Sequence, residues 1–84
     1  MLTRHQVFRN GFHAFSLESH RHGIKYRLYY GLKDGRCIVR YDNEAGKGDH
    51  RHYENREEPY RFIDVETLVR DFLADVVAAR RADQ

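Results

Sequence analysis

Hydrophobic and polar residues alternate most regularly between residues 24 and 31 of this chain. One face of the pattern holds Ile24, Tyr26, Leu28 and Tyr30, and the other holds Lys25, Arg27 and Tyr29. A period of two is typical of a β-strand with one buried face. After the turn sequence Lys33-Asp34-Gly35, residues 36–42 alternate again, with Cys37, Val39 and Tyr41 on one face and Ile38, Arg40 and Asp42 on the other. The pattern therefore predicts a β-hairpin over residues 24–42.

The segment before this hairpin has a shorter apolar pattern, which is interrupted by Asn10-Gly11. Asn-Gly is a strong signal for a two-residue hairpin turn, because both residues tolerate the left-handed backbone that such turns need. We therefore predict two strands, over residues 4–9 and 12–18. The polar run from Ser19 to Gly23 is interpreted as a loop.

The last part of the chain has a helical pattern. Apolar residues recur at the spacing of one helix face, at Val65, Leu68, Val69, Phe72, Leu73 and Val76. Asp64 is a suitable N-cap, because its carboxylate can accept a hydrogen bond from a free N–H of the first turn. We therefore predict a helix over residues 65–81. A short strand is predicted at Tyr60-Arg61-Phe62, just after Pro59.

Together these elements predict one α+β domain over residues 1–84, with a small antiparallel β-sheet of about four to five strands covered by one C-terminal α-helix. A chain of 84 residues has room for one modest core, and its eleven aromatic residues argue against disorder. The single cysteine excludes an internal disulfide. The chain has no signal-peptide pattern and no apolar stretch long enough to span a membrane, so we expect a cytoplasmic location.

Charge is distributed unevenly along the chain. Residues 1–62 carry twelve Lys and Arg against eight Asp and Glu, whereas residues 63–84 carry three against five. All six histidines lie in the basic part. A basic sheet region beside an acidic helix is compatible with an anionic partner such as RNA or DNA, and equally with an ordinary charged surface.

The run from Tyr41 to Tyr53 holds the densest polar chemistry in the chain. If this segment is extended, two of its histidines point to the same side, where they could serve as base and acid near neutral pH. Cations beside them could hold a phosphate. The candidate catalytic residues are therefore His50, His52, Asp42, Lys47 and Arg51. The candidate substrate-binding residues, chosen for base stacking and polar contacts to RNA, are Tyr41, Asn43, Arg40, Arg27 and Tyr53.

Other interpretations of this run remain open, including an ordinary solvated turn. With Asp42, Asp49 or Glu44, the two histidines could bind a metal ion, but their spacing matches no specific metal signature. Gly46-Lys47-Gly48 lacks the P-loop pattern of nucleotide-binding loops. We therefore expect neither a metal nor another cofactor.

Glu57 and Glu58 are adjacent carboxylates that could act as a catalytic pair. Adjacent residues in a strand point to opposite faces, so the two carboxylates are better explained as a negative rim or as partners of Arg56 and Arg61.

Three parts of the chain resemble the TumE-type toxin family of bacterial type II toxin–antitoxin modules: Tyr26-Arg27-Leu28, the run from Val39 to His52, and Tyr60-Arg61-Phe62 with the C-terminal helix. Tyr41-Asp42-Asn43 with the downstream Asp49-His50-Arg51-His52 is the specific part of the resemblance. The resemblance covers most of the chain from about residue 24 onward. It implies a small cytoplasmic toxin whose cognate antitoxin, commonly a helix-turn-helix regulator, blocks the toxin and represses the operon.

The resemblance and the polar run lead to one working hypothesis. The chain is the toxin of a toxin–antitoxin module and inhibits growth by binding or cleaving RNA through residues 41–53, in the second case as a ribonuclease. The alternative is a non-catalytic module that binds nucleic acid or protein and acts with a helix-turn-helix partner. A homodimer formed through an unpaired sheet edge is compatible with either hypothesis.

Overall fold

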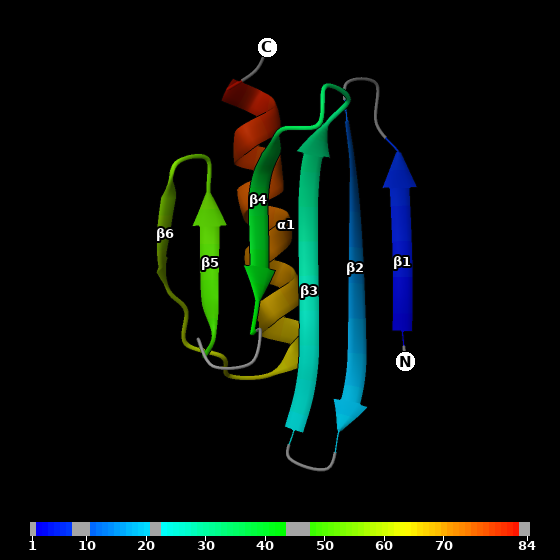
Figure 1. Cartoon of the computed structure of the whole chain (residues 1–84), viewed down its shortest axis with the longest axis vertical. Coiled ribbons are helices and arrows are strands. Elements are labelled where there is room, and N and C mark those ends of the chain that lie inside the picture. The colour runs from blue at the N-terminus through cyan, green and yellow to red at the C-terminus, as the bar shows by residue number, and fades with distance from the viewer. Residues whose placement is uncertain (1, 8–10, 21–22, 44–47, 83–84) are drawn as a thin grey trace.

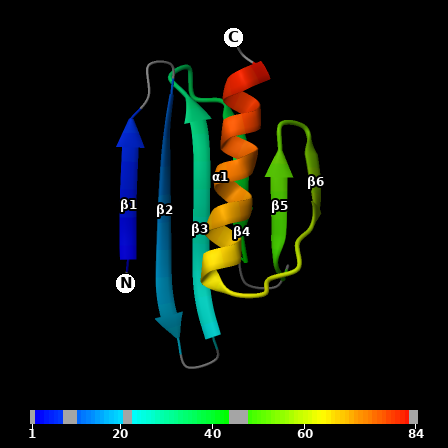
Figure 2. The same ribbon diagram turned by 180° about the vertical axis from the view of Figure 1, so that it is seen from behind.

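A single antiparallel sheet with one helix on one face makes up the fold (Figure 1). The computed structural model describes residues 2–7, 11–20, 23–43 and 48–82, and for residues 2–7 and 20 it describes the backbone. The described strands follow one another in the order β1-β2-β3-β4-β5-β6. Their bounds are β1 Leu2–Val7, β2 Gly11–His20, β3 Gly23–Leu32, β4 Cys37–Asp42, β5 His50–Tyr53 and β6 Arg56–Pro59. The helix α1, Val65–Ala82, lies across β3 and β4 (Figure 2), which confirms the predicted α+β class.

The described sheet has six strands, because β5 and β6, for which the sequence predicted no strand, pair with their neighbours. β2 continues to His20 and β3 begins at Gly23, so Ser19 is a strand residue and the predicted loop is shorter. The run from Tyr41 to Tyr53 contains β5, which pairs with β4 on one side and with β6 on the other. Positions 8–9 of the first predicted strand, residues 21–22 and residues 44–47 lie outside the described residues.

The predicted strand at Tyr60-Arg61-Phe62 is wrong, because the chain leaves the sheet at this point to reach the helix. The backbone N–H of Tyr60 donates a last hydrogen bond to the Asp49 carbonyl oxygen at 3.1 Å. The aromatic rings of the segment then pack on the helix side of the sheet, with Phe62 stacked on Tyr26 at a centroid distance of 5.6 Å.

A β-bulge reverses part of the face assignment predicted for β4. Tyr30 pairs with Val39 but the next residue of β3, Gly31, pairs with Cys37, so Ile38 is left over between them. Ile38 is therefore only 8% exposed and belongs to the core. The alternating pattern predicts it on the other face of the strand from Val39, so this face assignment is wrong. Burial raises the pKa of the Cys37 thiol, which disfavours the reactive thiolate form.

Helix α1 begins as predicted and buries most of the predicted stripe. The Asp64 carboxylate accepts a hydrogen bond from the Thr67 N–H at 2.7 Å, which confirms the N-cap. Leu68, Phe72 and Val76 are at most 2% exposed. Leu73 is the exception at 37% exposed, because it lies beyond the edge of the face that contacts the sheet.

The two faces of the sheet therefore differ. On the helix side, side chains from β2, β3 and β4 form the core with α1, and the most buried of them are Leu28, Val39 and Tyr41. No element in the described part of the chain covers the other face, which Figure 1 views from the front. We call this the open face, and it carries the polar positions of the alternating pattern.

Candidate functional site

The cross-strand register lines up side chains in two rows across the open face. Residues that oppose each other directly in an antiparallel sheet lie on the same face. One row runs from β2 to β6 through Ala14, Tyr29, Arg40, His52 and Glu57, and the next runs through Ser16, Arg27, Asp42, His50 and Pro59. Adjacent strands are about 4.8 Å apart, so the backbones of Tyr29 and His52 are separated by roughly 10 Å. We call Tyr29, Arg40, His52 and Glu57 the central row.

Asp42 and His50 form the buried part of this face, each 7% exposed. The Nε2 atom of His50 lies 2.8 Å from Oδ1 of Asp42, and its Nδ1 atom lies 3.1 Å from the Gly48 carbonyl oxygen. A carbonyl oxygen can only accept a hydrogen bond, and so can an ionised carboxylate. Both ring nitrogens of His50 thus face acceptors within the protein. This ring is suited to holding β4 and β5 together rather than to exchanging a proton with a ligand.

Arg40 joins the buried pair to the central row. Its Nε atom lies 3.2 Å from Oδ2 of Asp42, and a terminal nitrogen lies 4.0 Å from Oε2 of Glu57. The Asp42 carboxylate therefore sits between His50 and the Arg40 guanidinium. Two carboxylates restrain the guanidinium, which keeps it on the open face beside His52.

His52 differs from His50, because no described residue forms a hydrogen bond or ion pair with its ring nitrogens. It lies between Arg40 and Glu57 in the register and is partly exposed. Its Nδ1 atom is buried without a hydrogen-bond partner among the residues that the structure describes. The ring as a whole is partly exposed, so a ligand can reach the ring but not this buried atom. Of the two predicted histidines, His52 is therefore the one whose ring is not already bonded to another described residue.

Glu57 and Glu58 lie on opposite faces, as the alternation predicted. Their partners differ from the predicted ones, because Glu57 is near Arg40 while Glu58 pairs with Arg51 at 2.6 Å. The predicted pairing with Arg56 and Arg61 had assumed neighbours in sequence, whereas the partners come from neighbouring strands.

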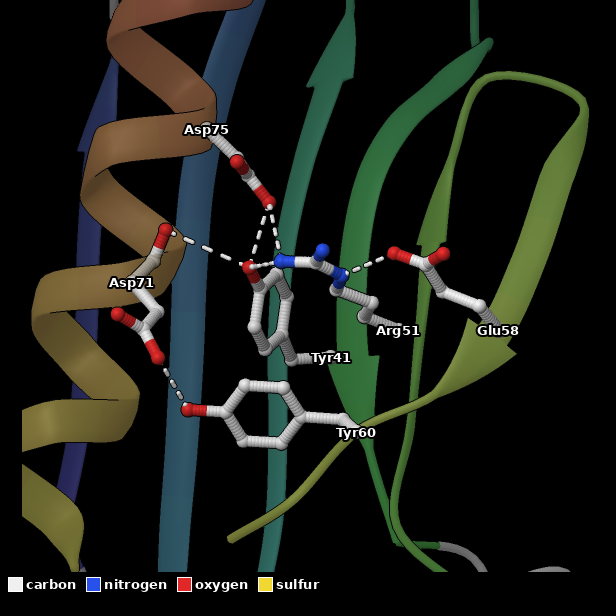
Figure 3. Close-up of polar contacts among 6 residues, drawn as sticks. All are labelled: Tyr41, Arg51, Glu58, Tyr60, Asp71 and Asp75. Atoms are coloured by element: carbon white, nitrogen blue, oxygen red, sulfur yellow. Dashed lines mark hydrogen bonds and ion pairs between the residues drawn. The ribbon is translucent and has the colours of Figure 1, made fainter. Parts of the chain in front are cut away.

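Arg51 and Tyr41 lie on the helix side, where they join the sheet to α1 (Figure 3). The Tyr41 hydroxyl donates to Oδ2 of Asp75 at 2.5 Å and accepts a hydrogen bond from Arg51 at 3.2 Å. Burial and the bond to Asp75 raise the pKa of the Tyr41 hydroxyl, and the bonds to Tyr41 and Glu58 raise the pKa of Arg51. Tyr41 thus keeps its proton and Arg51 keeps its charge near neutral pH, so neither is suited to acid–base catalysis.

Tyr60 extends the same network to the start of the helix (Figure 3). Its hydroxyl donates to Oδ2 of Asp71 at 2.7 Å, and its ring packs edge-on against Tyr41 at a centroid distance of 4.9 Å. The helix carboxylates Asp71 and Asp75 are thus bound by groups from the sheet side of the molecule. Two of the acidic residues in this part of the chain thus have a structural role.

The other predicted site residues have separate positions. The Asn43 amide accepts a hydrogen bond from the Tyr26 N–H at 3.0 Å and donates to the Ile24 carbonyl at 2.7 Å, so it continues the pairing of β3 and β4. Tyr53 is partly buried against the core opposite Val39. Lys47 lies outside the described residues. The structure therefore brings together five of the predicted residues on the open face: Arg27, Arg40, Asp42, His50 and His52.

Two residues of the central row, Tyr29 and Glu57, were missing from the predicted site. For Tyr29 the signal was present, because the alternation of β3 already placed it on the polar face with Arg27. For Glu57 it was absent, because Arg56–Pro59 has no apolar alternation that would reveal a strand.

Within the described residues, no group of three or more His, Cys, Asp or Glu side chains is placed to hold a metal ion. No described helix is both long enough and apolar enough to cross a membrane.

Comparison with known proteins gives one match. A family model described as toxin TumE matches residues 7–81, so the similarity begins well before residue 24 and includes the whole of β2. Neither the curated proteins nor the solved structures contain a match to this chain. Because the family model covers most of the chain, the protein belongs to the TumE toxin family.

Proposed function

We propose that this toxin inhibits growth by binding and cleaving RNA on the open face of its sheet, and that it is produced in the cytoplasm beside a helix-turn-helix antitoxin. The observation that carries the proposal is the central row, in which an aromatic ring, a guanidinium, an imidazole and a carboxylate follow one another across four strands. Rings that stack on bases, together with cations that meet phosphates, are the usual means of binding single-stranded RNA.

The proposed chemistry divides proton transfer between neighbours in the row. Cleavage through the 2′-hydroxyl needs one group that accepts its proton and another that protonates the leaving oxygen. His52 and Glu57 oppose each other directly in β5 and β6, within the same stretch of open face. Arg40, which lies next to both, is placed to stabilise negative charge on the phosphate during the reaction.

Arg27 supplies the sharpest test of RNA binding. Its side chain is exposed on the open face and forms no hydrogen bond or ion pair with a described residue. We expect Arg27→Glu to weaken binding of a single-stranded oligoribonucleotide and to lower the slope of log Kd against log salt concentration by about 1, because one phosphate contact is lost. Fluorescence anisotropy at several salt concentrations measures both quantities.

Arg70→Glu is the matched control, because it changes the net charge by the same amount. Arg70 lies on α1, where it pairs with Glu66 at 3.0 Å and is well exposed. The proposal expects RNA binding by this variant to stay close to that of the wild type. Equal losses in the two variants would mean that net charge alone drives binding, and absence of RNA binding by the wild type would overturn the proposed function.

A further inference from the structure

The open face has an apolar hollow beside the central row that the proposed chemistry does not use. It has a volume of about 440 Å³, within the range of small-ligand sites, and it is lined by Phe12, Ala14, Phe15, Ser16, Arg27 and Tyr29. The rings of Phe12 and Tyr29 have a centroid distance of 5.7 Å and are tilted by 36°. Two aromatic rings therefore border a partly exposed hollow on a face that is otherwise polar.

Gly31 explains how Tyr29 lies on the sheet. A Cβ atom added to Gly31 would meet the Tyr29 hydroxyl oxygen at 2.5 Å, Cε1 at 2.6 Å and Cζ at 2.8 Å. The outer half of the Tyr29 ring thus occupies the space that any side chain at Gly31 would fill. With Gly31 beneath it, the outer part of the ring lies along the surface of the sheet, and the residue is partly exposed.

Positive charge flanks this aromatic pair. Arg27 lines the hollow, and Arg40 directly opposes Tyr29 in β4. Both guanidinium groups are close enough to Tyr29 to act against the rise in its pKa that burial causes. An aromatic surface between two cations complements a nucleotide, whose base is a flat π-system and whose phosphate is an anion. An apolar protein segment would not complement these charges.

We propose that the Phe12–Tyr29 hollow is a subsite for one unpaired RNA base, which stacks on the Tyr29 ring. The phosphate next to this base meets Arg27, and the chain continues across Arg40 toward His52. The ligand class is single-stranded RNA, because a base inside a duplex is already stacked and paired and cannot lie on a protein ring. This inference rests on the proposed function, since it names the substrate class of the same face.

Substitutions at Tyr29 separate base stacking from apolar contact. We expect Tyr29→Leu to weaken binding of an unstructured single-stranded 8-mer RNA by about 5- to 100-fold, the range associated with loss of one stacked base. Tyr29→Phe keeps the ring and is expected to bind like the wild type. Binding of a 16-base-pair RNA duplex should be the same for all three proteins. Anisotropy titrations provide the affinities, and circular dichroism checks that each variant is folded.

Gly31→Ala is a second variant that keeps both aromatic residues in the chain. Its Cβ would force the tip of the Tyr29 side chain off the sheet, and because that tip is the far end of a flexible side chain, the fold should tolerate the change. We expect Gly31→Ala to lose single-strand affinity in the same direction as Tyr29→Leu.

The outcomes distinguish failure of the subsite from failure of the proposed function. If the wild type binds the 8-mer and Arg27→Glu weakens binding but Tyr29→Leu does not, the subsite is overturned while RNA binding by the open face stands. If the wild type binds no RNA, both proposals fail.

Discussion

Replacement of His52 by alanine is expected to lower RNA cleavage by roughly 10²- to 10⁴-fold, the usual contribution of a positioned acid or base. Its ring nitrogens have no hydrogen-bond partner among the described residues, and it lies between Arg40 and Glu57 on the open face. Because the ring is partly exposed, its loss should affect the fold little. Single-turnover cleavage of a labelled RNA measures the rate, and induced expression in bacteria should show matching loss of growth inhibition.

His50→Ala is the informative comparison, because the sequence alone treats the two histidines alike. His50 is buried and its two ring nitrogens face Asp42 and the Gly48 carbonyl oxygen. We expect this substitution to act through stability, since it leaves the buried Asp42 carboxylate with one partner fewer. Cleavage by folded His52→Ala at the wild-type rate would contradict the assigned role of His52.

Replacement of Phe72 by alanine is expected to cost about 3–5 kcal/mol of unfolding free energy, the usual range for removing a large buried aromatic side chain. Phe72 is 0% exposed, and its ring contacts both His13 of β2 and Tyr41 of β4. Small domains are stable by only about 5–15 kcal/mol in total, so this loss would leave the protein marginal. Urea unfolding, with midpoint and slope fitted together, measures the change.

Leu73→Ala is the control for this substitution, because Leu73 is the next residue of α1 and is 37% exposed. Its expected cost is well below that of Phe72→Ala, although both residues belong to the apolar stripe predicted from the sequence. Equal costs for the two variants would contradict the placement of α1 on the sheet.

The alternation of apolar and polar residues predicted the two faces of β3 well. In a regular strand, successive side chains point to opposite faces, so every second residue is buried. The prediction failed at Ile38, because a β-bulge inserts one extra residue into β4 and moves Ile38 to the buried face. The hydrophobic pattern of the sequence does not reveal such a bulge. It also missed β5, whose sequence His-Arg-His-Tyr has no apolar face of its own. This strand exists because β4 and β6 pair with it, and such pairing is not a local property of the sequence.

Only part of the candidate site was predicted, because the sequence shows which residues share a strand but not which strands are neighbours. An extended segment does place His50 and His52 on one face, as predicted, but it also sends Arg51 to the other. Tyr41 was expected to be near the ligand because it is close in sequence, whereas the structure places it beneath the helix, hydrogen-bonded to Asp75. Glu57 comes from another strand and joins the row only through the pairing of β5 with β6.

The division between faces also separates two kinds of residue that the sequence mixes in one short run. On the helix side, Tyr41, Arg51 and Asp75 stabilise the contact between α1 and the sheet. On the open face, Arg40 and His52 lie where no described element covers them. Substitutions on the helix side should therefore lower the stability of the fold. Substitutions of Arg40 and His52 on the open face should instead lower RNA affinity or the rate of cleavage.

The most direct test of RNA recognition by the open face is NMR chemical-shift mapping of the folded protein during titration with a single-stranded 8-mer RNA. We expect the largest chemical-shift changes at Arg27, Tyr29, Arg40 and His52. The signals of exposed residues of α1, such as Arg70 and Leu73, should stay unchanged. Shifts concentrated on α1, or no shifts at saturating RNA, would contradict the account.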